Sequence, residues 1–200
     1  MSDLQCPARV ILARHGEAAI PETGGPRTLT QRGAEQAREL SGAAQDRRVA
    51  ALWSSTMTRA RQTASIVAEQ LRLPVTYDDR LRELIADEGS VPDRNDADPG
   101  DVYASWLEGD LDGAMFGETG HQVVARLESV VEEVADRFRG ETVLLVSHGG
   151  IIELGLIALC RNVDRGWTDA HPLEPGDAVE LDVDSSGWVC RRWTDQPLAP

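Results

Sequence analysis

The chain has 200 residues, of which 41% are hydrophobic and 27% charged, as in ordinary globular proteins with a buried core. Its formal net charge of −14 excludes nucleic acid and anionic membrane surfaces as general partners. All 20 basic side chains are arginine, so arginine, histidine or backbone N–H groups must bind any anionic ligand.

The cysteines and the apolar segments indicate the compartment. Cys6, Cys160 and Cys190 are widely spaced and include no C-x-x-C pair, which is typical of free thiols in a reducing environment. No secretory signal is visible at the start of the sequence. The apolar window 151–160 is too short and, with Glu153, too polar to span a bilayer. We therefore expect a cytoplasmic protein that forms one domain over 1–200.

The first half of the chain alternates between strand and helix patterns. In chain order the patterns predict a strand over 8–13, a turn over 21–27, a helix over 30–44 with Thr30 as its N-cap, a strand over 49–55, a helix over 58–73 that Pro74 ends, and a short strand and turn over 74–84.

The segment 85–120 is acidic and interrupted by glycine and proline, and only a short helix around 102–107 is predicted within it. We interpret this segment as a lid-like insertion, because a long loop inside a compact domain is usually functional. The patterns that follow predict a helix over 119–138, a strong strand over 141–150, an apolar helix over 151–160, and an antiparallel hairpin of 179–183 and 188–193.

This alternation predicts an α/β three-layer sandwich, with a mostly parallel central sheet flanked by helices and an antiparallel edge. In such folds ligands bind at the carboxyl ends of the parallel strands. Three predicted strands end in polar residues there: Arg14 and His15 after the first, Ser54 and Ser55 with Arg59 shortly after the second, and Ser147 and His148 after the third. The sequence therefore predicts a polar pocket at this edge.

Two histidines and two arginines suit a phosphoryl group held against a nucleophile. A neutral imidazole can attack phosphorus and carry the phosphoryl group covalently. Guanidinium groups can bind its non-bridging oxygens, and the first turn of the helix that holds Arg59 adds free N–H groups. Gly16 and Gly149 let the backbone approach the anion closely.

Five blocks of the sequence, "ARHGEA", "LTQRGAEQA", "SSTMTRARQTA", "RLREL" and "LLVSHGG", lie in order between residues 10 and 155. Together they resemble the histidine phosphatase superfamily, also called the phosphoglycerate mutase-like family. The resemblance implies a phosphoglycerate mutase-like fold, and a catalytic activity that needs no metal and no cofactor. It implies that His15 is the phosphorylated nucleophile, that Arg14, Arg59 and His148 form the phosphate pocket, and that Glu83 is the acid that protonates the leaving oxygen.

The sequence also departs from the family pattern. Thr23 and Gly24 are candidate phosphate contacts in a short, unusual loop, and Asp87 and Glu88 are alternative proton donors to Glu83. Segment 85–120 lacks the arginine pair of true mutases, which disfavours a mutase. Trp106 in this segment is a candidate substrate contact.

The resulting hypothesis is a metal-independent phosphoric monoester hydrolase of the histidine acid phosphatase type, acting on a small phosphorylated metabolite with a neutral, hydroxyl-rich remainder. The alternatives are a protein phosphohistidine phosphatase, whose leaving group needs little proton assistance, and a non-catalytic anion sensor. A metal-dependent hydrolase is disfavoured because no H-x-H or H-E-x-x-H motif is present. The sequence leaves open whether the protein forms a homodimer.

Overall fold

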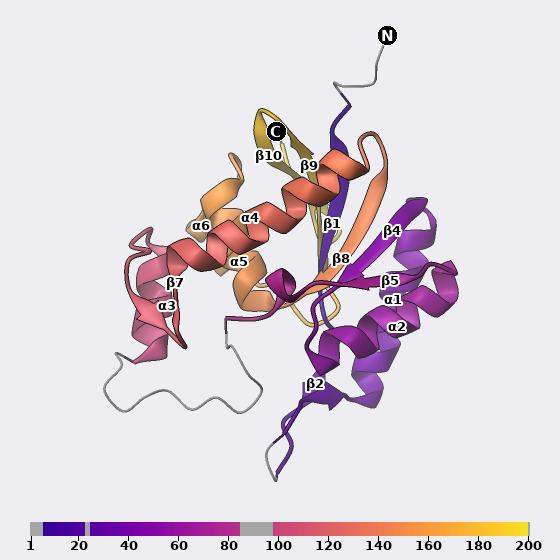
Figure 1. The fold of residues 1–200 in the computed structure, drawn as a ribbon, viewed down its shortest axis with the longest axis horizontal. Helices are drawn as coiled ribbons and strands as arrows, with labels where there is room; N and C mark the ends of the chain where they lie inside the picture. The colour runs from indigo at the N-terminus through magenta and orange to yellow at the C-terminus, as the bar shows by residue number, and fades with distance from the viewer. Residues whose placement is uncertain (1–5, 23–24, 85–97, 200) are drawn as a thin grey trace.

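The computed structural model describes residues 6–22, 25–84 and 98–199. Its centre is a seven-stranded sheet in the order β11–β10–β9–β1–β8–β4–β5 (Figure 1). The strands of this sheet are β1 (Ala8–Arg14), β4 (Val49–Ser54), β5 (Val75–Tyr77), β8 (Thr142–Ser147), β9 (Ala178–Asp184), β10 (Gly187–Trp193) and β11 (Gln196–Pro197).

The four strands β1, β8, β4 and β5 are parallel to one another, and β9 to β11 extend the sheet as an antiparallel edge. Both the parallel centre and the predicted hairpin are therefore confirmed. In the register of this sheet Arg14 pairs with Ser147, and Ser54 pairs with Val146. The polar residues that follow β1, β4 and β8 consequently leave the sheet at one edge, as the sequence predicts.

Alternate residues of β1 enter two separate cores. Val10 and Leu12 belong to a core built with α4 and α5, whereas Ile11 and Ala13 belong to one built with α1 and α2. These helices cover opposite faces of the sheet and make the three layers (Figure 1). The helices are α1 (Gln31–Gln45), α2 (Thr58–Leu71), α3 (Pro99–Leu107), α4 (Gly120–Arg137), α5 (Gly149–Leu159) and α6 (Arg165–Ala170), with a 3-10 turn, η1, over Asp79–Leu81.

Side-chain caps set the starts of the two helices that have the clearest patterns. Thr30 accepts a hydrogen bond from the N–H of Gly33 and begins α1, as predicted. Thr119 and Gln122 form a reciprocal capping box at the start of α4.

The segment 98–119 is more regular than the sequence predicts. Asp98 caps α3 and Pro99 occupies its first turn, which extends this helix beyond the predicted 102–107. Val102 and Trp106 lie one turn apart and are both buried in the core, so Trp106 is a packing residue and the interpretation of it as a substrate contact is wrong. A hairpin of β6 (Ala114–Met115) and β7 (Glu118–Thr119) follows. Residues 85–97 lie outside the described part of the chain, and a lid-like role for this insertion stays a prediction.

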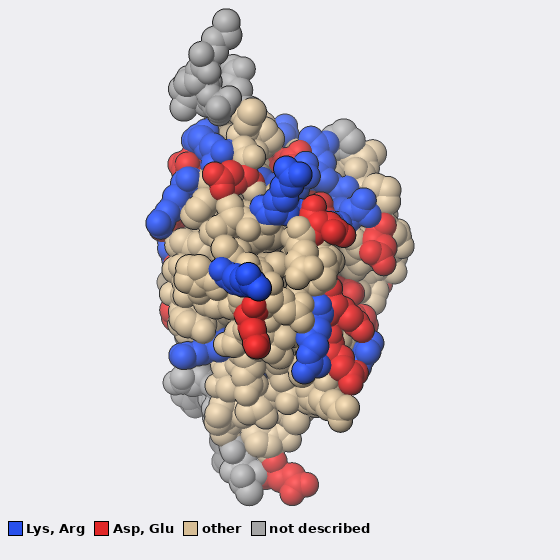
Figure 2. Space-filling model, turned by 90° about the vertical axis from the view of Figure 1, so that its right-hand side faces the viewer, with Lys and Arg blue, Asp and Glu red and all other residues tan. Residues whose placement is uncertain are grey.

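Several other short elements were also not predicted, because they are too short to show a periodic pattern. They include α6, β11 and the hairpin of β2 (Ala18–Ala19) with β3 (Thr28–Leu29), which encloses the predicted turn. On the side of the molecule formed by α1 and α2, arginine and acidic side chains are interspersed (Figure 2). Within the described ranges, no helix is both long and apolar enough to cross a membrane.

Candidate active site

His15 follows β1 directly and lies almost fully buried, with 8% of its surface exposed. Its Nδ1 lies 2.7 Å from the carbonyl oxygen of Gly16, and the Nε of Arg59 donates to its Nε2 at 2.8 Å. Since an arginine N–H only donates, the proton of the neutral ring resides on Nδ1 and the lone pair on Nε2. This hydrogen bonding orients Nε2 as the nucleophilic atom.

His148 follows β8 and is fully buried. Its ring centroid lies 5.0 Å from that of His15, with the ring planes at 64°. The Nε2 of His148 lies 2.8 Å from the Ser55 hydroxyl, which accepts the N–H of Met57 at 3.2 Å. The Ser55 hydroxyl can donate its proton to Nε2, and we assign His148 the neutral tautomer that carries its ring proton on Nδ1.

Two buried nitrogens of this site have no hydrogen-bond partner among the described residues: Nε of Arg14 and Nδ1 of His148. Arg14 is held in place because its Nη1 donates to the carbonyl oxygen of Leu173 at 2.6 Å. A Cβ at Gly149 would lie 3.2 Å from Nε of Arg14, so the glycine allows the guanidinium to pack against the start of α5. Unpaired buried donors are costly, and these two are suited to an anion.

Glu83 lies at the amino end of α5. Its carboxylate accepts hydrogen bonds from the backbone N–H groups of Leu84, Gly150 and Ile151 at 3.1, 3.3 and 3.1 Å. A Cβ at position 150 would come within 2.9 Å of Glu83 Oε1, so only glycine permits this approach. The structure thus brings Glu83 next to Gly149 and Arg14, which line one cavity with it.

Arg126 positions the segment that carries Glu83. It is a buried side chain of α4, and it donates to the carbonyl oxygens of Arg80, Arg82 and Glu83 at 2.8, 2.7 and 3.1 Å. Arg126 was not predicted as a functional residue from the sequence. The available signal was its position beside Leu127, an apolar residue on the buried face of α4.

The remaining predicted residues differ in their placement. Arg59 lies in the first turn of α2, as predicted. The N–H of Gly16 donates to Thr63 at 3.1 Å, and a Cβ at Gly16 would lie 2.3 Å from the carbonyl oxygen of Gly33. Close packing against α1 therefore explains this glycine, and its contact with substrate stays a prediction. Thr23, Gly24, Asp87 and Glu88 lie outside the described residues.

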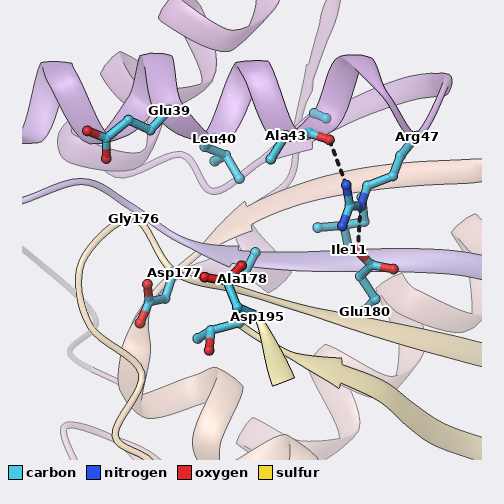
Figure 3. A pocket seen from close by; sticks show the side chains of 12 residues that line it. Ile11, Glu39, Leu40, Ala43, Arg47, Gly176, Asp177, Ala178, Glu180 and Asp195 are labelled. Carbon is cyan, nitrogen blue, oxygen red and sulfur yellow. Dashed lines mark hydrogen bonds and ion pairs between the residues drawn. The ribbon is translucent and has the colours of Figure 1, made fainter. Parts of the chain in front are cut away.

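A cavity of about 270 Å³ adjoins the site and is lined by Arg14, Glu83 and Gly149 together with residues of α3, α5 and α6. A second cavity, of about 230 Å³, lies between α1 and the start of β9 (Figure 3). It contains none of the predicted site residues, and its arginine, Arg47, binds the Ala43 carbonyl and the Glu180 carboxylate. Among the described residues, no group of three histidine, cysteine, aspartate or glutamate side chains is placed to hold a metal ion.

Both histidines are held neutral at ordinary pH. Burial, followed by the charges of Arg59 and Arg14, lowers the pKa of His15 from 6.5 to about 3, against an opposing effect of the Gly16 carbonyl. Burial and the charge of Arg59 also lower the pKa of His148 well below its usual value. An unprotonated His15 keeps its Nε2 lone pair for attack on phosphorus.

These shifts predict how stability depends on pH. Between about pH 3 and 6.5 the unfolded chain binds a proton at position 15 that the folded protein does not bind, so the free energy of unfolding decreases as the pH falls. We expect His15→Asn to reduce this dependence between pH 4 and 6 by about 1.4 kcal/mol per pH unit. Urea unfolding at several pH values measures it. His121→Asn, at an exposed histidine, is the control, and equal slopes in wild type and His15→Asn would contradict the assignment.

Comparison with known proteins places the chain in a family. The model of the histidine phosphatase superfamily (branch 1) matches residues 10–196. The chain belongs to that superfamily, and the observed fold is the one that the resemblance implies.

The similar proteins include phosphatases and a mutase. The chain is 28% identical to a probable phosphoglycerate mutase of Escherichia coli O1:K1, over 92% of this chain and 89% of the relative. A mycobacterial glucosyl-3-phosphoglycerate phosphatase solved with VO3 is 26% identical, with a TM-score of 0.73 over 94% of this chain and 99% of that one. A putative α-ribazole-5′-phosphate phosphatase from Escherichia coli K-12 is 22% identical, with a TM-score of 0.66 over 97% and 99% of the two chains, and shares the fold. The family and these relatives support an enzyme of the phosphatase or mutase type.

Proposed function

We propose that this protein is a metal-independent phosphatase that hydrolyses phosphomonoesters of small metabolites through a phosphohistidine on His15. The observation that carries the proposal is the pair of buried donors without partners, Nε of Arg14 and Nδ1 of His148, beside the Nε2 lone pair of His15. A phosphoryl group provides the acceptor oxygens that these donors lack. The cytoplasm as its compartment stays a prediction.

In the first step, the Arg59 N–H moves from Nε2 of His15 to a phosphoryl oxygen, which frees the Nε2 lone pair. Nε2 then attacks phosphorus and the bond from phosphorus to the ester oxygen breaks. Arg14, Arg59 and His148 donate to the non-bridging oxygens, whose charge they stabilise through the transition state. The protonated carboxyl of Glu83 gives its proton to the leaving oxygen, which departs as an alcohol. The Gly16 carbonyl, which accepts Nδ1–H of His15, stabilises the positive charge that develops on the ring.

In the second step, water attacks the phosphorus of phosphohistidine. The Glu83 carboxylate takes a proton from this water, the bond between phosphorus and Nε2 breaks, and inorganic phosphate is released. His15 returns to its neutral form and Glu83 to its protonated form. All protons thereby balance over one cycle.

One feature of the sequence favours a phosphatase over a mutase. A mutase must hold a second phosphate while the first is on the histidine, and the sequence offers no arginine pair in 85–120 for that purpose.

Rapid acid-free quenching after mixing with radiolabelled p-nitrophenyl phosphate, with EDTA present, tests the proposal. We expect a labelled protein whose label is stable in alkali and lost in acid, as for phosphohistidine, and whose decay releases inorganic phosphate. Vanadate is expected to prevent labelling. Absence of labelled protein during turnover, loss of activity with EDTA, or transfer of label to an added phosphate ester in place of water would each contradict the proposal.

A further inference from the structure

The cavity of about 270 Å³ is lined by Arg14, which is proposed to bind the phosphate, and by Glu83, which is proposed to protonate the leaving oxygen. We therefore assign this cavity to the part of the substrate that leaves with the ester oxygen. Its lining also includes residues of α5, Tyr103 of α3, and four residues from the C-terminal part of the chain: Thr168, Pro172, Leu173 and Trp193. Its volume lies just below the roughly 300–1,000 Å³ that is usual for ligand sites, which restricts the leaving alcohol to a small molecule.

The hydrogen bonds of the lining make this cavity rich in acceptors. Apart from Arg14, every described side-chain donor in the lining already donates within the protein: Tyr103 to Glu153, Thr168 to Arg165 and Trp193 to His171. The acceptor oxygens of Glu153 and Tyr103 remain for a ligand. A leaving group that carries hydrogen-bond donors matches this wall.

The charged side chains that line the cavity also favour a cationic group on the substrate. Glu153 lies on α5 one turn beyond Gly149, and it forms no ion pair with any described cation. Its Oε2 accepts the Tyr103 hydroxyl at 2.8 Å, and Tyr103 is kept as a neutral donor because burial and the charge of Glu153 raise its pKa. Arg14, the only cation in the described lining, faces the proposed phosphate site. The cavity therefore presents one uncompensated carboxylate beyond the phosphate.

We propose that Glu153, oriented by Tyr103, binds a protonated amine of the substrate, so that the enzyme prefers phosphomonoesters of small amino alcohols. This inference rests on the proposed function and names its substrate class. It replaces the neutral remainder that the sequence indicates, because the sequence could not show that Glu153 lines this cavity without an ion pair to a described cation. A carboxylate on the remainder of the substrate is disfavoured by the same charge.

Three substrates with one two-carbon skeleton test the proposal: phosphoethanolamine, 2-hydroxyethyl phosphate and phosphoglycolate. We expect kcat/KM of the wild type to be at least about tenfold higher for the amine than for the hydroxyl compound, and lowest for the carboxylate. Glu153→Gln keeps the shape of the side chain and an acceptor for Tyr103. It is expected to reduce the amine-to-hydroxyl ratio to about one and to raise the relative rate for phosphoglycolate.

The ratio of kcat/KM between two substrates is compared within each variant, because this ratio does not depend on the fraction of enzyme that is active. Glu108→Gln removes an exposed carboxylate at the end of α3, and is expected to leave the ratios as in the wild type. A wild type that prefers the hydroxyl or carboxylate compound, or a Glu153→Gln variant with unchanged ratios, would overturn the inference. Phosphoenzyme formation from p-nitrophenyl phosphate would still support the phosphatase in that case, whereas its absence would overturn the proposed function itself.

Discussion

His15→Asn is expected to reduce kcat by roughly 10⁴-fold or more, because it removes the atom that accepts the phosphoryl group. Asparagine fills much of the same space and still offers polar atoms to Arg59. The variant is therefore expected to remain folded and to bind inorganic phosphate through Arg14, Arg59 and His148. The measurements are steady-state turnover of p-nitrophenyl phosphate, phosphoenzyme labelling, and phosphate binding by calorimetry.

His148 is the alternative nucleophile against which the assignment of His15 must be tested. His148 lies with its ring centroid 5.0 Å from that of His15, and it is also kept neutral by burial. If His15→Asn still formed an alkali-stable phosphoenzyme, the nucleophile would be His148 and the proposed roles would be wrong. His121→Asn, which changes an exposed histidine of α4, is expected to turn over at the wild-type rate.

The sequence was sufficient to place the residues that the backbone alone brings together. Arg14 is the last residue of β1, and His15 and His148 directly follow β1 and β8. One rule about the carboxyl ends of parallel strands predicts that these residues converge. Arg59 follows from the same rule and the start of a helix four residues after β4. These predictions need only the strand pattern and the chain direction.

The sequence could not predict contacts that depend on side-chain packing between distant elements. Ser55 and His148 are 93 positions apart, and Tyr103 and Glu153 are 50 apart, so no local pattern links either pair. The regular structure of 98–107 was underestimated for a related reason. Acidic and glycine residues around it conceal a one-turn apolar pair, Val102 and Trp106, that becomes decisive only against the rest of the core.

Glu83 is the position where the sequence and the structure allow two different roles. Resemblance to the family implies a proton donor, whereas the structure shows a carboxylate that accepts three N–H groups at the amino end of α5. Glu83→Gln separates the two roles, because glutamine keeps one acceptor for these N–H groups but cannot protonate a leaving oxygen.

We expect Glu83→Gln to slow phosphoenzyme formation from alkyl phosphates by about 10²- to 10⁴-fold, and from p-nitrophenyl phosphate by less than about tenfold. An alkoxide is a poor leaving group that needs a proton, whereas p-nitrophenolate departs without one. Single-turnover rates measure this difference directly, because the second step, which also uses Glu83, does not contribute to them. Glu108→Gln is the control for loss of a carboxylate. If the rate decreased equally for both substrates, Glu83 would act only by capping α5. If the rate decreased for neither, proton donation would belong to another acid, with Asp87 and Glu88 as the first candidates.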